Sequence, residues 1–76
     1  MAVRETGAVG SSPVRECRKV KRVTQAELAE AVGVSRQTII AVERGDYSPS
    51  VYLAIRIART LERSVEELFV LEEGSR

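Results

Sequence analysis

Residues 24–45 read TQAELAEAVGVSRQTIIAVERG, and this stretch decides the fold. Thr24 followed three residues later by Glu27 is a capping box, in which each side chain accepts a hydrogen bond from the other residue's backbone N–H. The box predicts the start of a helix over about 25–32. Gly33 follows that helix and supplies the left-handed conformation that ends one.

A second helix follows after only a short turn. Ser35 is a typical N-cap, and the segment 36–44 ends at Gly45, another residue suited to a left-handed stop. Two helices joined by a three-residue turn are typical of a helix-turn-helix. Ala29 is small enough for a close helix crossing, and the apolar positions expected between the two helices are Leu28, Val32, Val34, Ile39 and Val42.

Upstream of this pair, the sequence predicts a helix over about 13–21. Ser12 can cap it, and Pro13 suits the first helical position because its missing N–H has no partner there in any case. Val14, Cys17 and Val20 recur at intervals of three and predict an apolar stripe. Beside several cations, the Cys17 thiol is either a buried small hydrophobe or a redox-sensitive group.

Downstream, two more helices are expected, over about 51–61 and about 65–69. Ser50 can cap the first after a turn that contains Pro49, and a second capping box begins at Ser64. Apolar residues at helical spacing in the first of these helices predict the central core helix; they are Val51, Ala54, Ile57, Ala58 and Leu61, with Leu53 and Ile55 widening the face. The expected fold class is therefore all-α, with five helices.

The chain ends are expected to lie outside this domain. Residues 1–12 contain small residues without helical periodicity and are interpreted as a flexible segment. Residues 13–71 form the predicted domain, and 72–76 form a polar tail.

Composition excludes several classes of function. The chain has 76 residues, no His and one Cys, so it lacks the usual zinc ligand sets and the nucleophile pairs of hydrolases. We expect no enzyme activity, no metal and no cofactor. A single thiol, without a run of about 18 apolar residues or an apolar leader, predicts a soluble cytoplasmic protein that is not bound to a membrane.

Charge is unevenly distributed, although the net charge is only +1. Residues 15–22 carry five basic side chains and one acidic one, whereas 62–73 carry five Glu and one Arg. The basic segment is either a solvated helix face or a surface that attracts phosphates.

The segments TQAELAEAVGVSRQTI, ERGDYSPS, LAIRIARTL and SVEELF resemble, in this order, the phage repressor and Cro-like (Xre-type) helix-turn-helix family, especially its short stand-alone members. The resemblance covers about residues 14–69. It implies a five-helix, lambda-repressor-like DNA-binding domain whose helix 36–44 lies in the major groove.

If Ile39 and Val42 face inward, the opposite side of that helix can contact DNA. Arg can recognise guanine and Gln can recognise adenine, so Arg36 and Gln37 are assigned to base edges. Ile40 and Ala41 either contact thymine methyl groups or lie over packed surface. The expected phosphate contacts are Gln25, which resembles the family's phosphate-binding Gln, together with Ser35, Thr38, Arg44, Tyr47 and Ser48.

Three further expectations come from the resemblance. Arg18 and Glu43 match a buried salt bridge between the first and third helices. Arg22 and Glu62 stand where the family often has Gly, so the turns there are expected to be strained or differently shaped. Some short relatives dimerise near the C-terminus, which implicates Leu68, Phe69, Val70 and Leu71, although Leu68 and Phe69 serve equally well as core residues.

The predicted function is that of a transcriptional regulator, most simply a repressor, that binds a palindromic operator in double-stranded DNA as a homodimer. The alternative is an antitoxin-like or anti-regulator module whose main partner is a protein. A ligand sensor is disfavoured because so short a chain leaves little volume for a pocket.

Overall fold

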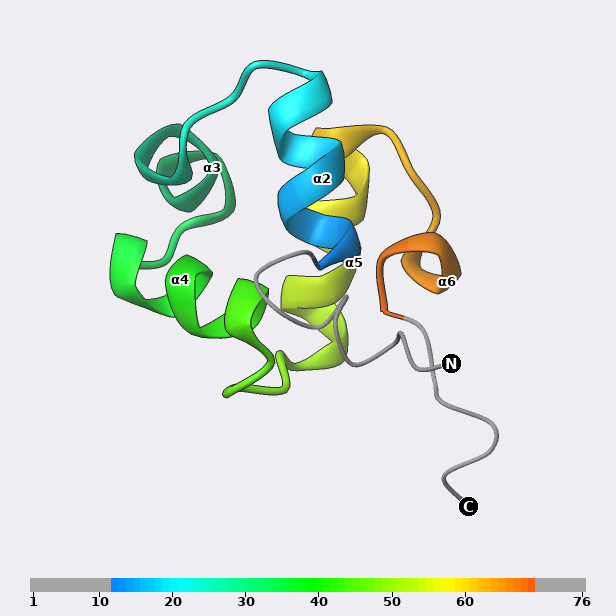
Figure 1. Cartoon of the computed structure of the whole chain (residues 1–76). Coiled ribbons are helices and arrows are strands. Elements are labelled where there is room, and N and C mark those ends of the chain that lie inside the picture. The colour runs from blue at the N-terminus through cyan, green and yellow to red at the C-terminus, as the bar shows by residue number, and fades with distance from the viewer. Residues whose placement is uncertain (1–11, 70–76) are drawn as a thin grey trace, which may run out of the picture.

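The computed structural model describes residues 12–69, which form five α-helices (Figure 1). Their bounds are α2 (Pro13–Val20), α3 (Gln25–Val32), α4 (Arg36–Arg44), α5 (Val51–Leu61) and α6 (Val65–Leu68). The pair α3 and α4 lies on one side of the molecule and α6 on the other, with α2 and α5 between them (Figure 1). The expected all-α, five-helix fold is confirmed.

Each helix begins directly after a Ser or Thr whose side-chain oxygen accepts a backbone N–H three residues further on, at 3.0–3.2 Å. These N-caps are Ser12, Thr24, Ser35, Ser50 and Ser64. Both expected capping boxes are present, because Glu27 and Glu67 return a carboxylate oxygen to the backbone N–H of their caps. The helix starts are therefore determined by local sequence.

Left-handed residues follow four of the helices. Gly33 (φ 78°) and Gly45 (φ 81°) end α3 and α4 as predicted. Arg22 (φ 60°) and Glu62 (φ 58°) adopt the same conformation without being glycine. The turns therefore keep the shape that glycine would give, and the backbone at each of these two positions is strained by roughly 1–2 kcal/mol because Cβ lies close to a carbonyl oxygen.

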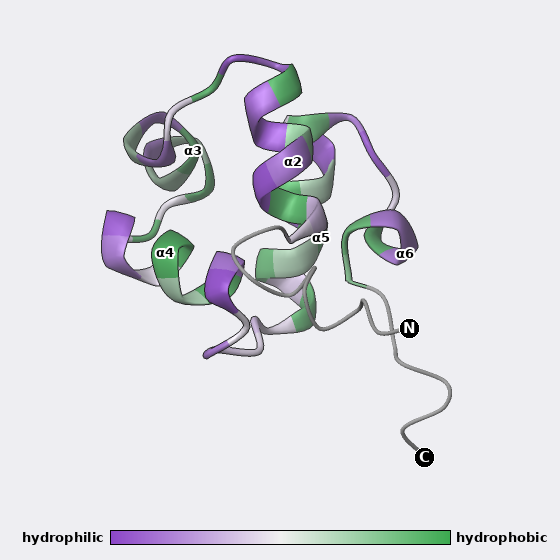
Figure 2. Cartoon of the chain, viewed as in Figure 1, coloured by the Kyte–Doolittle hydropathy of each residue, from purple (hydrophilic) through white to green (hydrophobic). Residues whose placement is uncertain are grey.

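The core fills the space among all five helices. Leu28, Ile39 and Ile57 have no exposed surface, and burial of a side chain of this size contributes roughly 1.5–3 kcal/mol. Figure 2 shows apolar and polar segments alternating along the helices, as expected when each helix buries one side. The buried set also includes Val14, Ala29, Val32, Val42, Leu53, Ala58, Leu61 and Leu68.

The predicted stripe on the first helix is wrong at its last member. Val14 is buried and Cys17 is half-buried against the core, but Val20 is 70% exposed. Steps of three residues fall about 60° short of a full turn each, so Val20 lies about 120° around the helix from Val14. Arg18, four residues after Val14, takes the inward position instead.

Two predicted helix ends differ by one residue. The first helix stops at Val20 because the chain turns at Lys21 and Arg22, and the last helix stops at Leu68 because Phe69 has left the helical conformation (φ −123°, ψ 80°). Along residues 12–69, no helix combines the length and the apolar character needed to span a bilayer.

Candidate nucleic-acid interface

The turn between α3 and α4 is held by two hydrogen bonds, one within the turn and one from α5. Val34 donates its backbone N–H to the Ala29 carbonyl at 3.0 Å, which closes the left-handed stop at Gly33. From α5, the Arg56 guanidinium donates to the Val32 carbonyl at 3.2 Å and so satisfies the C-terminal end of α3. These contacts fix the angle at which α4 leaves the turn.

One side of α4 is buried and the other is accessible. Ile39 and Val42 face the core, as expected, whereas Arg36 and Gln37 are exposed. Within residues 12–69, neither the Arg36 nor the Gln37 side chain makes a hydrogen bond or ion pair, so their side-chain donor groups are available to another molecule. The adjacent positions, occupied by Ile40 and Ala41, are half-buried and form the apolar part of the same surface.

The predicted phosphate contacts lie around both ends of α4. Ser35 accepts the Thr38 backbone N–H at 3.2 Å, and the two hydroxyl oxygens lie 3.1 Å apart. At the other end, Arg44 Nε lies 3.4 Å from Asp46 Oδ2, with both side chains more than 60% exposed. Tyr47 and Ser48 are exposed in the turn that follows.

Gln25, the first residue of α3, is not an isolated surface residue. Its side chain is half-buried, and Nε2 donates to Glu43 Oε1 on α4 at 3.1 Å. This contact has no signal in the sequence. Its two residues are 18 positions apart, and only the packing of α3 against α4 brings them together.

Glu43 also receives the guanidinium of Arg18 from α2. The distances are 2.6 Å from Arg18 Nε to Oε2 and 3.3 Å from Nη2 to Oε1, and Arg18 Nη1 donates to the Val23 carbonyl at 2.9 Å. The structure therefore places the two residues of the expected salt bridge together, and both are buried.

The basic and acidic segments meet where Lys21 contacts Glu62. Of the basic segment, Lys19 and Arg22 are exposed, while Lys21 donates to Glu62 at 2.8 Å. This hydrogen bond, together with the charge of Lys21, lowers the pKa of Glu62. The pKa of Glu67 is also lowered, chiefly by the backbone N–H of Ser64. The acidic α6 lies on the side of the molecule opposite α3 and α4 (Figure 1).

The four predicted dimer residues have three different outcomes. Leu68 is only 2% exposed and packs in the core, so it has the core role that the sequence left open and does not offer a contact surface. Phe69 is half-buried at the molecular surface. Val70 and Leu71 lie outside the described residues.

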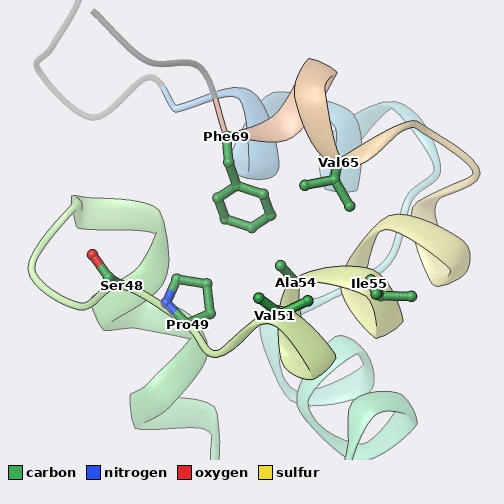
Figure 3. A pocket seen from close by; sticks show the side chains of 7 residues that line it. All are labelled: Ser48, Pro49, Val51, Ala54, Ile55, Val65 and Phe69. Carbon is green, nitrogen blue, oxygen red and sulfur yellow. The ribbon is translucent and has the colours of Figure 1, made fainter.

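Phe69 belongs to an apolar groove of about 420 Å³ between α6 and the start of α5. In Figure 3, Phe69 and Val65 point toward Pro49 and Val51 across this groove. Ser48, Ala54 and Ile55 complete its lining.

Three apolar side chains of α5 lie exposed at and beside the groove: Val51 (73%), Tyr52 (78%) and Ile55 (37%). The prediction that Val51 and Ile55 lie in the core is wrong, because α5 has more apolar surface than its neighbours cover. The sequence signal for this exposed surface was the width of the apolar face of α5, which is greater than one small domain can bury.

Comparisons with known proteins agree with this geometry. A family model described as "Helix-turn-helix" matches residues 14–68. An uncharacterised HTH-type transcriptional regulator of Methanothermobacter thermautotrophicus is 61% identical over 61 residues, which are 79% of this chain and 88% of that protein. The ImmF control region 10 kDa protein of Bacillus phage phi105 is 35% identical, over 80% of this chain and 73% of that one.

Two solved structures have the same fold. The restriction-modification controller protein C.AhdI of Aeromonas hydrophila has a TM-score of 0.71 at 30% identity, covering 87% of this chain and 98% of that one. The clp gene regulator ClgR of Corynebacterium glutamicum has a TM-score of 0.72 at 35% identity, covering 90% and 71%. A helix-turn-helix with an accessible second helix defines a class of DNA-binding proteins. The chain belongs to the helix-turn-helix family, in its Xre/Cro-like form, and is an HTH-type transcriptional regulator.

Proposed function

We propose that this regulator recognises a short operator in double-stranded DNA by inserting α4 into the major groove. The observation that carries the proposal is the pair Arg36 and Gln37 in the first turn of α4, whose side chains are exposed and have no partner within residues 12–69. A guanidinium matches guanine N7 and O6, and a carboxamide matches adenine N6 and N7. Ile40 and Ala41 add an apolar surface of the kind that contacts a thymine methyl group.

The polar side chains around α4 would hold the phosphate backbone. Contacts of this type fix how the protein lies on the duplex but carry little sequence information. The proposed set is Gln25, Ser35, Thr38, Arg44, Tyr47 and Ser48. The position of the acidic α6 on the opposite side supports this orientation, because α6 would point away from the DNA.

A homodimer is part of the proposal. One small domain contacts few base pairs, and useful affinity usually requires two copies on adjacent half-sites. We assign the contact between the copies to the apolar surface formed by Val51, Tyr52, Ile55 and Phe69. A second copy with the same surface can cover these side chains, and Val70 and Leu71 follow Phe69 directly in the sequence. Repression by occupying a promoter in the cytoplasm is the simplest outcome of such binding.

The test is selection of bound sites from a randomised duplex pool at near-physiological salt, followed by sequencing. A palindrome with half-site centres about 10 base pairs apart would support base recognition and dimerisation together. If folded protein enriches no sequence, the proposal fails. In that case, co-purification of a stoichiometric protein partner would favour the antitoxin-like or anti-regulator alternative.

A further inference from the structure

The Glu43 carboxylate is the point at which three helices meet. It accepts two hydrogen bonds from Arg18 on α2 and one from Gln25 on α3, while Glu43 itself belongs to α4. Oxygen Oε1 is shared, because it accepts both Arg18 Nη2 at 3.3 Å and Gln25 Nε2 at 3.1 Å. The Arg18 charge offsets that of Glu43, so the carboxylate can serve as an acceptor without adding net negative charge at this end of α3.

The contact determines which way the Gln25 carboxamide is turned. An ionised carboxylate only accepts hydrogen bonds, so the NH₂ group of Gln25, and not its oxygen, must face Glu43. One N–H is used in this way, and the second N–H has no partner within residues 12–69, so it is available to another molecule. Gln has a large side-chain entropy, so a carboxamide already held in place loses less freedom when it binds.

The backbone around Gln25 is arranged in a compatible way. The capping box occupies the N–H groups of Thr24 and Glu27. Those of Gln25 and Ala26 have no partner within residues 12–69 and lie at the positive end of the α3 dipole. A phosphate that meets the second N–H of Gln25 would therefore also meet these donors.

We propose that Glu43 is a positioning residue for DNA binding, which fixes the Gln25 side chain so that it is ready to donate to a phosphate. The inference rests on the proposed operator binding. It also adds a role for the Arg18–Glu43 pair beyond holding α2 against α4, since the same carboxylate links the phosphate contact to the recognition helix.

The first test uses the unmodified protein without DNA. The sequence contains two Gln and no Asn, so its NMR spectrum has two side-chain carboxamide groups, from Gln25 and the exposed Gln37. We expect a side-chain order parameter for Gln25 that approaches the value of rigid backbone, about 0.85, and one below about 0.6 for Gln37, the range of flexible groups. Equal values for the two groups would overturn the proposal.

The second test is a double-mutant cycle on affinity for the selected operator. Glu43→Gln should weaken binding roughly ten-fold in the unmodified chain and less than about two-fold in a Gln25→Ala chain, because the effect acts through Gln25. Equal losses in both chains would show a purely structural role and overturn the proposal. Glu30→Gln, an exposed charge removal on α3, is the control and should leave affinity unchanged.

The two tests also separate this inference from the proposed function. If the unmodified protein binds no DNA, operator recognition fails, whereas the order parameters still report whether Glu43 holds Gln25. If Glu43→Gln fails to fold, the order parameters of the unmodified protein decide the inference.

Discussion

Arg18 Nε on α2 lies 2.6 Å from Glu43 Oε2 on α4, and the two residues are only 9% and 6% exposed. A charge this deeply buried is tolerated only with a partner, because removing it from water is costly. Arg18 also donates to the Val23 carbonyl in the segment that leads into α3. One side chain therefore ties the first helix to both helices of the helix-turn-helix.

Removing one member of this pair should destabilise the fold strongly. We expect Glu43→Ala to lower the free energy of unfolding by roughly 3–5 kcal/mol, because Arg18 is then buried without a partner. The double variant Arg18→Met, Glu43→Leu should recover most of the loss. Denaturant unfolding measures both, with Lys21→Met at an exposed ion pair as the control for a small effect. A double variant as unstable as the single one would contradict the argument.

Arg22 and Glu62 adopt a left-handed conformation without being glycine, so a substitution there can raise the free energy of unfolding instead of lowering it. Arg22→Gly should stabilise the protein by roughly 0.5–1 kcal/mol, since glycine removes the Cβ strain at φ 60°. This value is smaller than the strain itself, because glycine loses more conformational entropy on folding. Gly45→Ala is the matched control. Nothing within residues 12–69 would contact a Cβ at Gly45, so the expected loss of roughly 1 kcal/mol in the free energy of unfolding would come from backbone strain alone. Thermal or denaturant unfolding measures the stability of both variants. A destabilised Arg22→Gly variant would contradict the prediction and show that contacts of the Arg22 side chain stabilise the fold by more than the backbone strain destabilises it.

The sequence predicted what depends on neighbours along the chain. Every helix start follows a Ser or Thr, and the stops at Gly33 and Gly45 need only the conformational freedom of glycine, so these features are local. The exposed pair Arg36 and Gln37 was also accessible to prediction, because the inward positions of the same helix are apolar.

What the sequence did not predict depends on how helices pack. Val51 and Val20 look like core residues by spacing, but the direction of each helix leaves them outside. Leu68 and Phe69 are both apolar, so the sequence does not say which of them is buried. In the structure α6 ends after Leu68, which is buried, while Phe69 has left the helix and is half-buried. The contact of Gln25 with Glu43 joins two helices and has no sequence signal of its own.

Base recognition by α4 predicts a sequence-dependent loss at Gln37. Gln37→Ala should weaken binding to the preferred operator by roughly 1–3 kcal/mol and relax the preference at one base pair, because the bidentate contact with adenine is gone. The exposed position of Gln37 makes a folding defect unexpected. Titration with the operator and with random duplex measures the difference, and an equal loss on both would count against base recognition by Gln37.

A phosphate contact by Arg44 predicts a different pattern. Arg44→Ala should weaken operator and random DNA alike and reduce the dependence of log K on log salt by roughly one. The Arg44 guanidinium is 71% exposed and its contact with Asp46 is long at 3.4 Å, so the charge is accessible to DNA. Arg63→Ala, beside the acidic α6, is the control that should leave the slope unchanged. An unchanged slope for Arg44→Ala would remove Arg44 from the phosphate set.

Dimerisation through the α5 surface predicts that a charge at Tyr52 separates the copies. Tyr52 is 78% exposed in the single chain, so Tyr52→Glu should leave folding intact and weaken self-association roughly thirty-fold, equivalent to about 2 kcal/mol at an interface anchor. Val20→Glu is the matched control, because Val20 is also apolar and 70% exposed but lies on α2. Sedimentation equilibrium over a concentration series compares the two variants with the unmodified chain. If both variants associate as the unmodified chain does, the dimer uses another surface. If the unmodified chain stays monomeric up to high concentration, the apolar side chains of α5 and Phe69 must be covered by a different protein, which is the outcome that the antitoxin-like alternative requires.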